Sequence, residues 1–200
     1  MKPAFIVMLA LGLGATAVGA QANPIATARD SARAYRGRNE AAIVREFATL
    51  LSIPNLATDS VEIRRNADTL VAMLGRRGFK NAQLLTVPGG PPAVYGELPA
   101  PGAARTLVLY AHYDGQPVDP KQWTTPPWNP VLRTRDLRSG GQVVPLPSPG
   151  QHVDPESRIY ARSAGDDKAS IMAILAAVDA MHASHLSPSV NLKVFFEGEE

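Results

Sequence analysis

Three apolar stretches, each followed by acidic side chains or histidine, most constrain what this chain can fold into. They are "TLVLYA" before His112 and Asp114, "RIYA" before Asp166 and Asp167, and "NLKVFF" before Glu197, Glu199 and Glu200. Short apolar runs of this kind are typical of buried strands. In open α/β sheets, ligands bind at the carboxyl ends of the strands. If the three strands run parallel in one sheet, their polar clusters meet at one edge.

The rest of the pattern supports an α/β fold with a mainly parallel sheet flanked by helices. Apolar residues recur with helical spacing between 43 and 51, where Pro54 ends the pattern. The pattern repeats over residues 60–79, with Leu70, Met73 and Leu74 on one face and Gly78 as a stop signal. Strongly apolar residues from about Lys168 predict a third helix. Helices that alternate with apolar strands favour this class. Residues 106–111 are expected to be buried on both faces, and residues 115–157 to form a long loop region.

Each polar cluster has a plain structural explanation when taken alone. His112 is compatible with a histidine at a strand end, Asp166 and Asp167 with the start of a helix, and the glutamates with a solvated strand end. Together on one sheet edge they would repel one another unless a cation offset the charge. The chain has no cysteine, so the donors are imidazole and carboxylate, which suit Zn²⁺, with Co²⁺ or Mn²⁺ as alternatives.

Three other histidines carry weaker signals. His182 and His185 lie near the predicted end of a helix, where imidazole is favourable, and are interpreted as structural. His152 lies in the long loop region, where it is a weak candidate for substrate contact.

Charge and the N-terminus limit the function further. The formal net charge is only +2, and without a dense basic run this argues against a nucleic-acid partner. Lys2, an apolar stretch over residues 4–18 and small residues at Ala20 and Ala22 form the pattern of a secretory signal peptide over residues 1–22. Residues 23–39 are predicted to be a polar lead-in and residues 40–200 a domain. We therefore expect a periplasmic or secreted protein with no membrane attachment after signal cleavage.

The three clusters resemble the motifs of the carnosinase, aminoacylase and glutamate-carboxypeptidase superfamily of dizinc metallopeptidases. "LVLYAHYDGQPV" is similar to its His-x-Asp strand, "IYARSAGDDKAS" to its Asp-Asp-Lys motif, and "VFFEGEE" to the start of its glutamate motif. The resemblance spans roughly residues 40–200 and implies the N-terminal part of a catalytic domain, truncated before a lid domain. It also implies that the 200 residues alone are inactive.

The resemblance implies a role for each site residue. His112 would be a terminal metal ligand, Asp114 would hydrogen-bond the His112 ring and fix its tautomer, and Asp166 would bridge two zinc ions. Glu200 would be the general base, with a metal-binding glutamate after it. An alignment shifted by one residue instead makes Glu199 the base and Glu200 a ligand. A further Asp and His would complete the ligands beyond residue 200.

The chain also departs from the family pattern. Ala161, Ser163 and Ala169 replace family glycines, so the backbone leading to Asp166 is expected to be restricted. The resemblance further implies a cis peptide bond between Asp166 and Asp167.

The expected function is hydrolysis of a dipeptide or C-terminal amide bond by a water activated between two metal ions. An N-acyl-amino-acid deacylase on the same scaffold and a non-catalytic periplasmic metal- or solute-binding protein are the alternatives. The expected partners are a small peptide or N-acyl-amino-acid substrate, and a second copy of the full-length protein paired through the lid domain.

Overall fold

The computed structural model describes residues 24–200, so the predicted signal peptide lies outside the described residues. Within that range no helix is both long enough and apolar enough to cross a membrane. In chain order the elements are α1 (Pro24–Leu51), α2 (Ser60–Arg76), β1 (Lys80–Leu85), β2 (Ala93–Leu98), β3 (Thr106–His112), the 3-10 helix η1 (Pro120–Gln122), β4 (Val131–Arg133), β5 (Val143–Val144), β6 (Arg158–Tyr160), α3 (Lys168–Ala183) and β7 (Asn191–Glu197).

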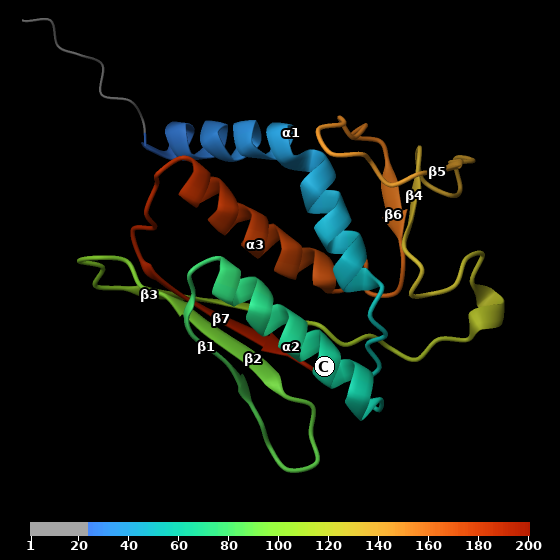
Figure 1. The fold of residues 1–200 in the computed structure, drawn as a ribbon, viewed down its shortest axis with the longest axis horizontal. Helices are drawn as coiled ribbons and strands as arrows, with labels where there is room; N and C mark the ends of the chain where they lie inside the picture. Colours follow the sequence, from blue (N-terminus) through green and yellow to red (C-terminus); the bar gives the residue numbers. More distant parts are fainter. Residues whose placement is uncertain (1–23) are drawn as a thin grey trace, which may run out of the picture.

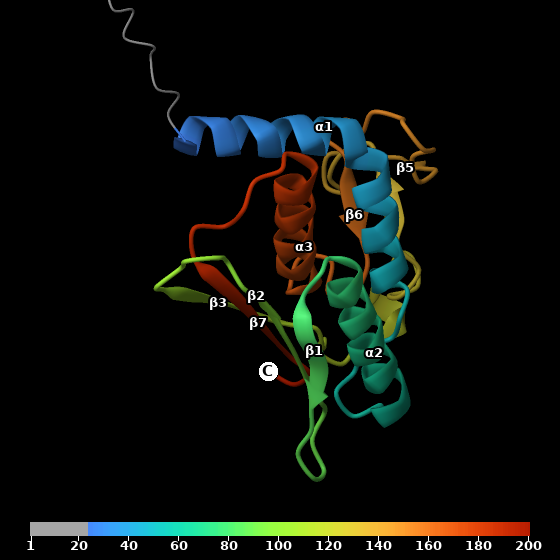
Figure 2. The ribbon, with the colours of Figure 1, turned by 60° about the vertical axis from the view of Figure 1, so that its left-hand side comes forward.

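The main sheet has the order β1-β2-β7-β3, and α2 and α3 pack on one of its faces (Figures 1 and 2). An α/β fold with helices packed on a sheet is therefore confirmed. The expectation of a mainly parallel sheet is wrong for the described strands, since only the β3–β7 pairing is parallel. The β1–β2 pairing is antiparallel because residues 86–92 join these two strands by a short connection. Such a connection can join only antiparallel strands, because parallel neighbours need a longer crossover.

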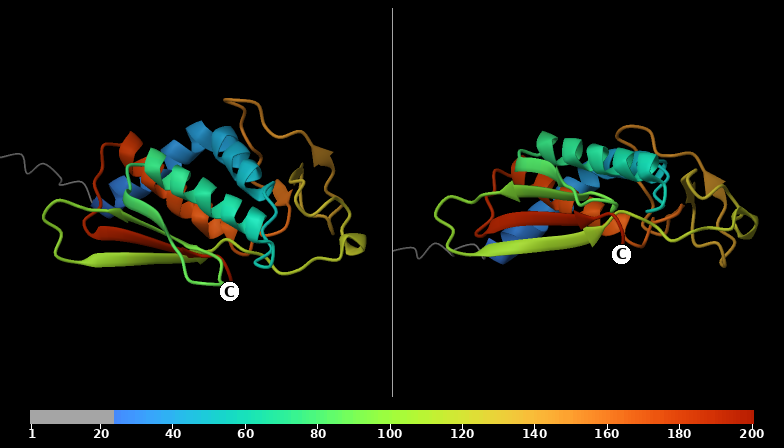
Figure 3. Two further views of the ribbon diagram at one scale, coloured as in Figure 1. Left: turned by 60° about the horizontal axis from the view of Figure 1, so that its bottom comes forward. Right: turned by 90° about the horizontal axis from the view of Figure 1, so that it is seen from below.

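Strand β3 was expected to be buried on both faces, and this is also wrong. Leu107, Val108 and Tyr110 are each about half exposed. β3 is an edge strand of the described sheet, and the face of the sheet opposite α2 and α3 carries no helix among residues 24–200 (Figure 3). Burial begins only at Ala111 and continues to Gly115, where the chain passes into the site.

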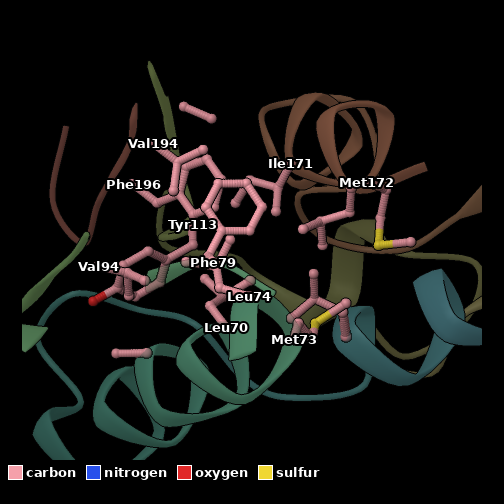
Figure 4. Close-up of a cluster of buried hydrophobic side chains, with 14 of the residues drawn as sticks. Leu70, Met73, Leu74, Phe79, Val94, Tyr113, Ile171, Met172, Val194 and Phe196 are labelled. Carbon is pink, nitrogen blue, oxygen red and sulfur yellow. The ribbon is translucent and has the colours of Figure 1, made fainter. Parts of the chain in front are cut away.

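The hydrophobic core lies between this sheet and helices α2 and α3. Val194 and Phe196 alternate with half-buried residues along β7 and point inward, as strand periodicity requires. They meet Leu74 from α2 and Ile171 from α3 (Figure 4). Tyr113, the residue after the His112 strand end, is fully buried in the same cluster. The polar strand ends are thus attached directly to the most rigid part of the molecule.

Two segments have more regular structure than expected. The polar lead-in, residues 23–39, is helical from Pro24 onward and forms the first part of α1, which bends before it reaches α2 (Figure 1). The long loop region at 115–157 contains η1, β4 and β5. Strands β5, β4 and β6 form a second, small antiparallel sheet beyond the carboxyl end of the main one (Figure 3).

A buried arginine joins the three helices behind the core. Arg77, the residue that caps α2, contacts Glu46 of α1 and Asp179 of α3 at 2.7 Å each through Nη2. Its side chain is 8% exposed, whereas the two carboxylates are 29% and 24% exposed. The guanidinium is therefore desolvated, and its two acidic partners are held close together.

We expect Arg77→Met to lower the free energy of unfolding by about 2–3 kcal/mol. Removing one member of a fully buried ion pair costs about 3–5 kcal/mol, and partial exposure of the two carboxylates reduces that cost. Arg64→Met is the matched control, because the Arg64–Asp68 pair is more than half exposed on both sides and should contribute less than about 1 kcal/mol. Urea unfolding of the two variants measures the difference; equal midpoints would contradict the assignment.

Candidate metal centre

The parallel pairing of β3 with β7 brings the first and third polar clusters together. His112 is in register with Glu197, and the backbone N–H of Tyr113 donates to the Glu197 carbonyl at 2.8 Å. Both strands therefore end at the same edge of the sheet, and the chain beyond Glu197 turns toward His112. This part of the strand-end prediction is confirmed.

Asp166 reaches the same edge by a route that the sequence did not predict. The strand before it, β6, is not in the main sheet but pairs antiparallel with β4 in the small one. The turn at residues 161–167 carries the chain back from the small sheet to the start of α3. Ser163 in this turn has φ +62°, a left-handed conformation that favours glycine. Its hydroxyl donates to the carbonyl of Asp114 at 3.2 Å. The expected cis peptide between Asp166 and Asp167 is present.

The three side chains meet around one ring nitrogen of His112. Nε2 lies 3.0 Å from Oδ1 of Asp166 and 3.5 Å from Oε2 of Glu200. The donor atoms of all three residues lie within 4.8 Å of one another. Nitrogen and oxygen ligands at about 2.0–2.2 Å from one tetrahedral zinc ion are roughly 3.3 Å apart. The donor types and their spacing therefore fit a divalent metal ion.

Asp114 holds the opposite side of the imidazole. Its Oδ1 is 3.0 Å from Nδ1 of His112, and both side chains are buried. A carboxylate that accepts a hydrogen bond from Nδ1–H keeps the proton of the neutral ring on Nδ1, so that Nε2 is free to bind a metal. This arrangement is found behind most metal-binding histidines. The spacing of two residues puts both groups on the same side of the chain, as the sequence predicted.

The three carboxylates around His112 affect the pKa of its imidazole. Burial acts to lower the pKa of His112, but hydrogen bonds to two carboxylates and the neighbouring charges outweigh it and raise the pKa above its ordinary value. The Asp166 and Glu200 side chains are 87% and 60% exposed, whereas that of His112 is only 9% exposed. The cluster thus presents two solvent-facing carboxylates over one buried imidazole.

The two glutamates at the end of the chain occupy different positions. Glu200 is in the His112 cluster, and its backbone N–H is 3.4 Å from Oδ2 of Asp114. Glu199 lines a groove between the 86–92 hairpin and β7 and is not part of the metal-ligating group found among the described residues. Of the two, Glu200 therefore has the geometry for a direct role.

The remaining histidines lie elsewhere. Nδ1 of His152 is 2.7 Å from Oε2 of Glu40 on α1, so it ties the long loop region to that helix. His182 is in the last turn of α3, and His185 follows the helix with φ +53°. The cluster around His112 includes none of these three.

Sequence reasoning missed two buried polar residues next to the site. Lys168 was assigned only to the start of a helix, yet its ammonium is fully buried and donates to the carbonyls of Leu50 and Ile53 and to Asn66 Oδ1. Burial lowers the pKa of Lys168 to about 7. Asn55 is also fully buried, but the sequence analysis assigned it no role. The one sequence signal for a buried role of Asn55 was its position after Pro54, at the end of an apolar helix. The partners of Asn55 are distant in sequence and could not be identified from it.

Glycine at position 198 allows the chain to bend toward the site. A Cβ there would lie 2.5 Å from the Tyr113 hydroxyl and 2.8 Å from Cβ of Pro91. Tyr113 cannot move away easily, because it is buried and donates a hydrogen bond to the Pro92 carbonyl. Gly198 therefore fixes how closely the end of β7 approaches the His112 strand.

We expect Gly198→Ala to destabilise the protein by about 1–3 kcal/mol, the usual cost of overpacking, and to lower activity by displacing Glu200. Gly75→Ala is the matched control. It lies within α2, where a Cβ would meet no atom within 4 Å, so it should stabilise by about 0.5–1 kcal/mol. Thermal unfolding and kcat of both variants test this. If Gly198→Ala were as stable and active as wild type, the close approach would be unimportant.

Comparison with known proteins agrees with this geometry. Residues 108–200 match Peptidase family M20/M25/M40. This stretch of the chain resembles that family. The match includes all four site residues, all of β7 and most of β3.

The chain is similar to several members of this family. The Cys-Gly metallodipeptidase DUG1 of Candida albicans is 28% identical over 166 residues, which is 75% of this chain and 30% of that protein. The succinyl-diaminopimelate desuccinylase of Acidovorax ebreus is 28% identical over 102 residues, or 50% of this chain and 20% of that enzyme. The chain therefore spans a third or less of the length of these relatives.

A solved structure confirms the fold. The dipeptidase Dug1p from Saccharomyces cerevisiae superposes with a TM-score of 0.66 at 21% identity, over 84% of this chain and 34% of that one. At this identity the likeness shows an M20 peptidase fold in the described residues. The predicted resemblance to the metallopeptidase superfamily is thus confirmed.

Proposed function

We propose that the full-length protein is a metal-dependent hydrolase that cleaves the amide bond of small peptides. The observation that carries the proposal is the convergence of His112, Asp166 and Glu200 within 4.8 Å, with Asp114 behind the imidazole. A buried imidazole with an orienting carboxylate, and an exposed carboxylate from Asp166, form an open donor set. The exposed carboxylate of Glu200 lies beside them, where it can act as a base. Such an arrangement suits a catalytic metal rather than a closed structural one.

In this proposal each residue has a separate task. A bound metal ion would supply Lewis-acid chemistry at this site, polarising a water molecule and the scissile carbonyl. His112 supplies Nε2 and Asp166 a carboxylate oxygen, while Asp114 keeps the imidazole in the tautomer that binds. Glu200 accepts the proton of the attacking water and passes it to the leaving amine, the role of a general base and then a general acid. Its exposed carboxylate lies beside the ring nitrogen that would hold the metal, so no rearrangement of the backbone is needed.

The substrate class rests on the relatives. The Candida albicans relative is a Cys-Gly metallodipeptidase and the yeast structure a dipeptidase, and both favour a dipeptide. The second candidate is an N-acyl-amino-acid deacylase, which the Acidovorax ebreus desuccinylase favours. In both cases the reaction is hydrolysis of an amide beside a small charged group.

Several parts of the proposal concern the whole protein. We propose that the site takes two zinc ions, with Co²⁺ or Mn²⁺ as substitutes, and that Asp166 would help to hold them. We also propose a signal peptide over residues 1–22 and a periplasmic or secreted location. The family resemblance supports a dimer formed through a lid domain. The apolar stretch after Lys2, followed by small residues at Ala20 and Ala22, supports the location.

The test is chelation and reconstitution of the purified full-length protein. We expect a chelator to abolish hydrolysis of dipeptides, and Zn²⁺ or Co²⁺ to restore it. A panel of dipeptides, C-terminal peptides and N-succinyl or N-acetyl amino acids separates the two candidates by kcat/KM. Full activity after the metal is removed would contradict the proposal. Tight metal binding without turnover of any amide would instead support a binding protein.

A further inference from the structure

A buried asparagine lies at the junction of the segments that carry the site. Asn55, in the connection between α1 and α2, is fully buried. Its Nδ2 donates to the Tyr113 carbonyl at 2.7 Å and to the Ser163 hydroxyl at 2.8 Å. Its Oδ1 accepts from Nε1 of Trp128 at 3.0 Å. Its backbone carbonyl accepts from the N–H of Gly115 at 2.8 Å. Asn55 thus uses both side-chain donors and both of its carbonyl oxygens.

These partners surround the metal-ligating residues without being ligands themselves. Tyr113 and Gly115 flank Asp114 on the β3 strand end, and Ser163 is in the turn that leads to Asp166. Ser163 accepts from Asn55 and donates to the Asp114 carbonyl, so the three segments form a closed hydrogen-bonded ring. Because the ring consists of uncharged groups, it holds the segments together whether or not a cation is bound.

The sheet does not provide this link by itself. Asp166 follows β6, which belongs to the small sheet, whereas His112 ends β3 of the main sheet. The side chains that must converge are mostly carboxylates, which repel one another at these distances. The α1–α2 connection is also tied to α3, since Lys168 donates to the carbonyls of Leu50 and Ile53. One short connection therefore contacts both segments whose separation sets the geometry of the site.

We propose that Asn55 is a positioning residue that fixes the separation of His112 and Asp166 and thereby sets metal affinity. The inference rests on the proposed function, in which these two residues hold a metal. Asn55 acts through Tyr113, Ser163 and Gly115 and touches neither metal nor substrate. Its amide is suited to the task because it donates to two segments and accepts from a third, which no apolar residue of similar size can do.

The test compares Asn55→Ala with Asn191→Ala in the full-length protein. Asn191 is a partly buried amide at the opposite end of β7, where it accepts from the Ala100 N–H and donates to the Ala103 carbonyl. Cobalt titration, followed by the visible absorption of the bound ion, gives metal affinity and ligand geometry. Melting temperature without metal gives stability, and kcat and KM are measured at saturating metal.

We expect Asn55→Ala to bind Co²⁺ about 10–100-fold more weakly, as substitutions behind metal ligands do, with an altered cobalt spectrum and a lower kcat. Asn191→Ala should melt earlier than wild type but keep the wild-type cobalt affinity and spectrum. Ser163→Ala removes two hydrogen bonds of the ring, and Trp128→Phe removes the hydrogen bond that holds Oδ1 of Asn55. They should weaken binding by smaller factors, and they carry the test if Asn55→Ala does not fold.

The possible failures are distinguishable. If Asn55→Ala, or both milder variants, kept wild-type cobalt affinity and spectrum while losing stability, Asn55 would be only structural and the inference would be wrong. If the wild-type protein took up no cobalt, the proposed metal centre itself would be wrong, and this inference would fail with it.

Discussion

Replacing Glu200 with Gln is expected to lower kcat of the full-length enzyme by about 10²–10⁴-fold, the usual contribution of a general base, while metal content is unchanged. Gln has the same shape but cannot accept a proton, so the substitution removes proton transfer and little else. The Glu200 side chain is 60% exposed, so the variant should keep the stability of the wild type. Steady-state kinetics together with metal analysis of the same preparation make the measurement.

Glu199→Gln is the matched control, one residue earlier and also exposed, and should keep nearly wild-type kcat. The pair also decides between the two alignments of the glutamate motif. If Glu200→Gln lost the metal, Glu200 would be a ligand and Glu199 the candidate base. If Glu200→Gln kept full activity, neither assignment of Glu200 would hold.

Replacing Asp166 with Ala should weaken metal binding by at least about 100-fold, beyond the 10–100-fold typical of residues behind the ligands, and abolish turnover. Because its side chain is 87% exposed, the fold should survive, and the melting temperature of the metal-free protein should change little. Loss of metal without loss of fold is the signature of a ligand. Calorimetric titration of the metal-free protein with Zn²⁺ gives the affinity.

Asp167→Ala provides the comparison for this experiment. Asp167 is the adjacent carboxylate at the start of α3, where it contacts the hydroxyl of Ser170. We expect it to affect helix stability slightly and metal binding much less than Asp166→Ala. Equal losses of affinity in the two variants would mean that general negative charge, rather than coordination by Asp166, attracts the cation.

The sequence predicted the site better than it predicted the sheet. The strand-end rule placed His112 and Asp114 correctly, because β3 ends at the edge where α/β proteins bind ligands. It did not account for the place of Asp166, since β6 belongs to the small sheet. Whether β1 and β2 run parallel or antiparallel depended on whether residues 86–92 form a hairpin turn or lead into a crossover. The Pro and Gly residues of this segment indicate a loop but do not show how the two strands pair. The exposure of Tyr110 was missed for a related reason, since an apolar run does not show whether its strand lies at the edge of a sheet.

The hydrogen bonds of the buried residues behind the site could not be predicted from the sequence for a different reason. Asn55 and Lys168 act through partners 58 and 118 residues away, and no local pattern encodes such pairs. Ser163 shows the opposite case. Its replacement of a family glycine was expected to restrict the turn, yet the residue keeps the left-handed φ that a glycine would adopt. Its hydroxyl offsets that restriction by hydrogen bonding to Asp114 and Asn55.

The most direct test of the metal centre is a crystal structure of the full-length, zinc-loaded protein with anomalous data collected at the zinc edge. We predict a strong anomalous peak about 2.0–2.2 Å from Nε2 of His112, within coordination distance of an Asp166 oxygen, with Asp114 still bonded to Nδ1. A zinc peak elsewhere in the molecule, with Nε2 of His112 still hydrogen-bonded to Asp166, would contradict the account.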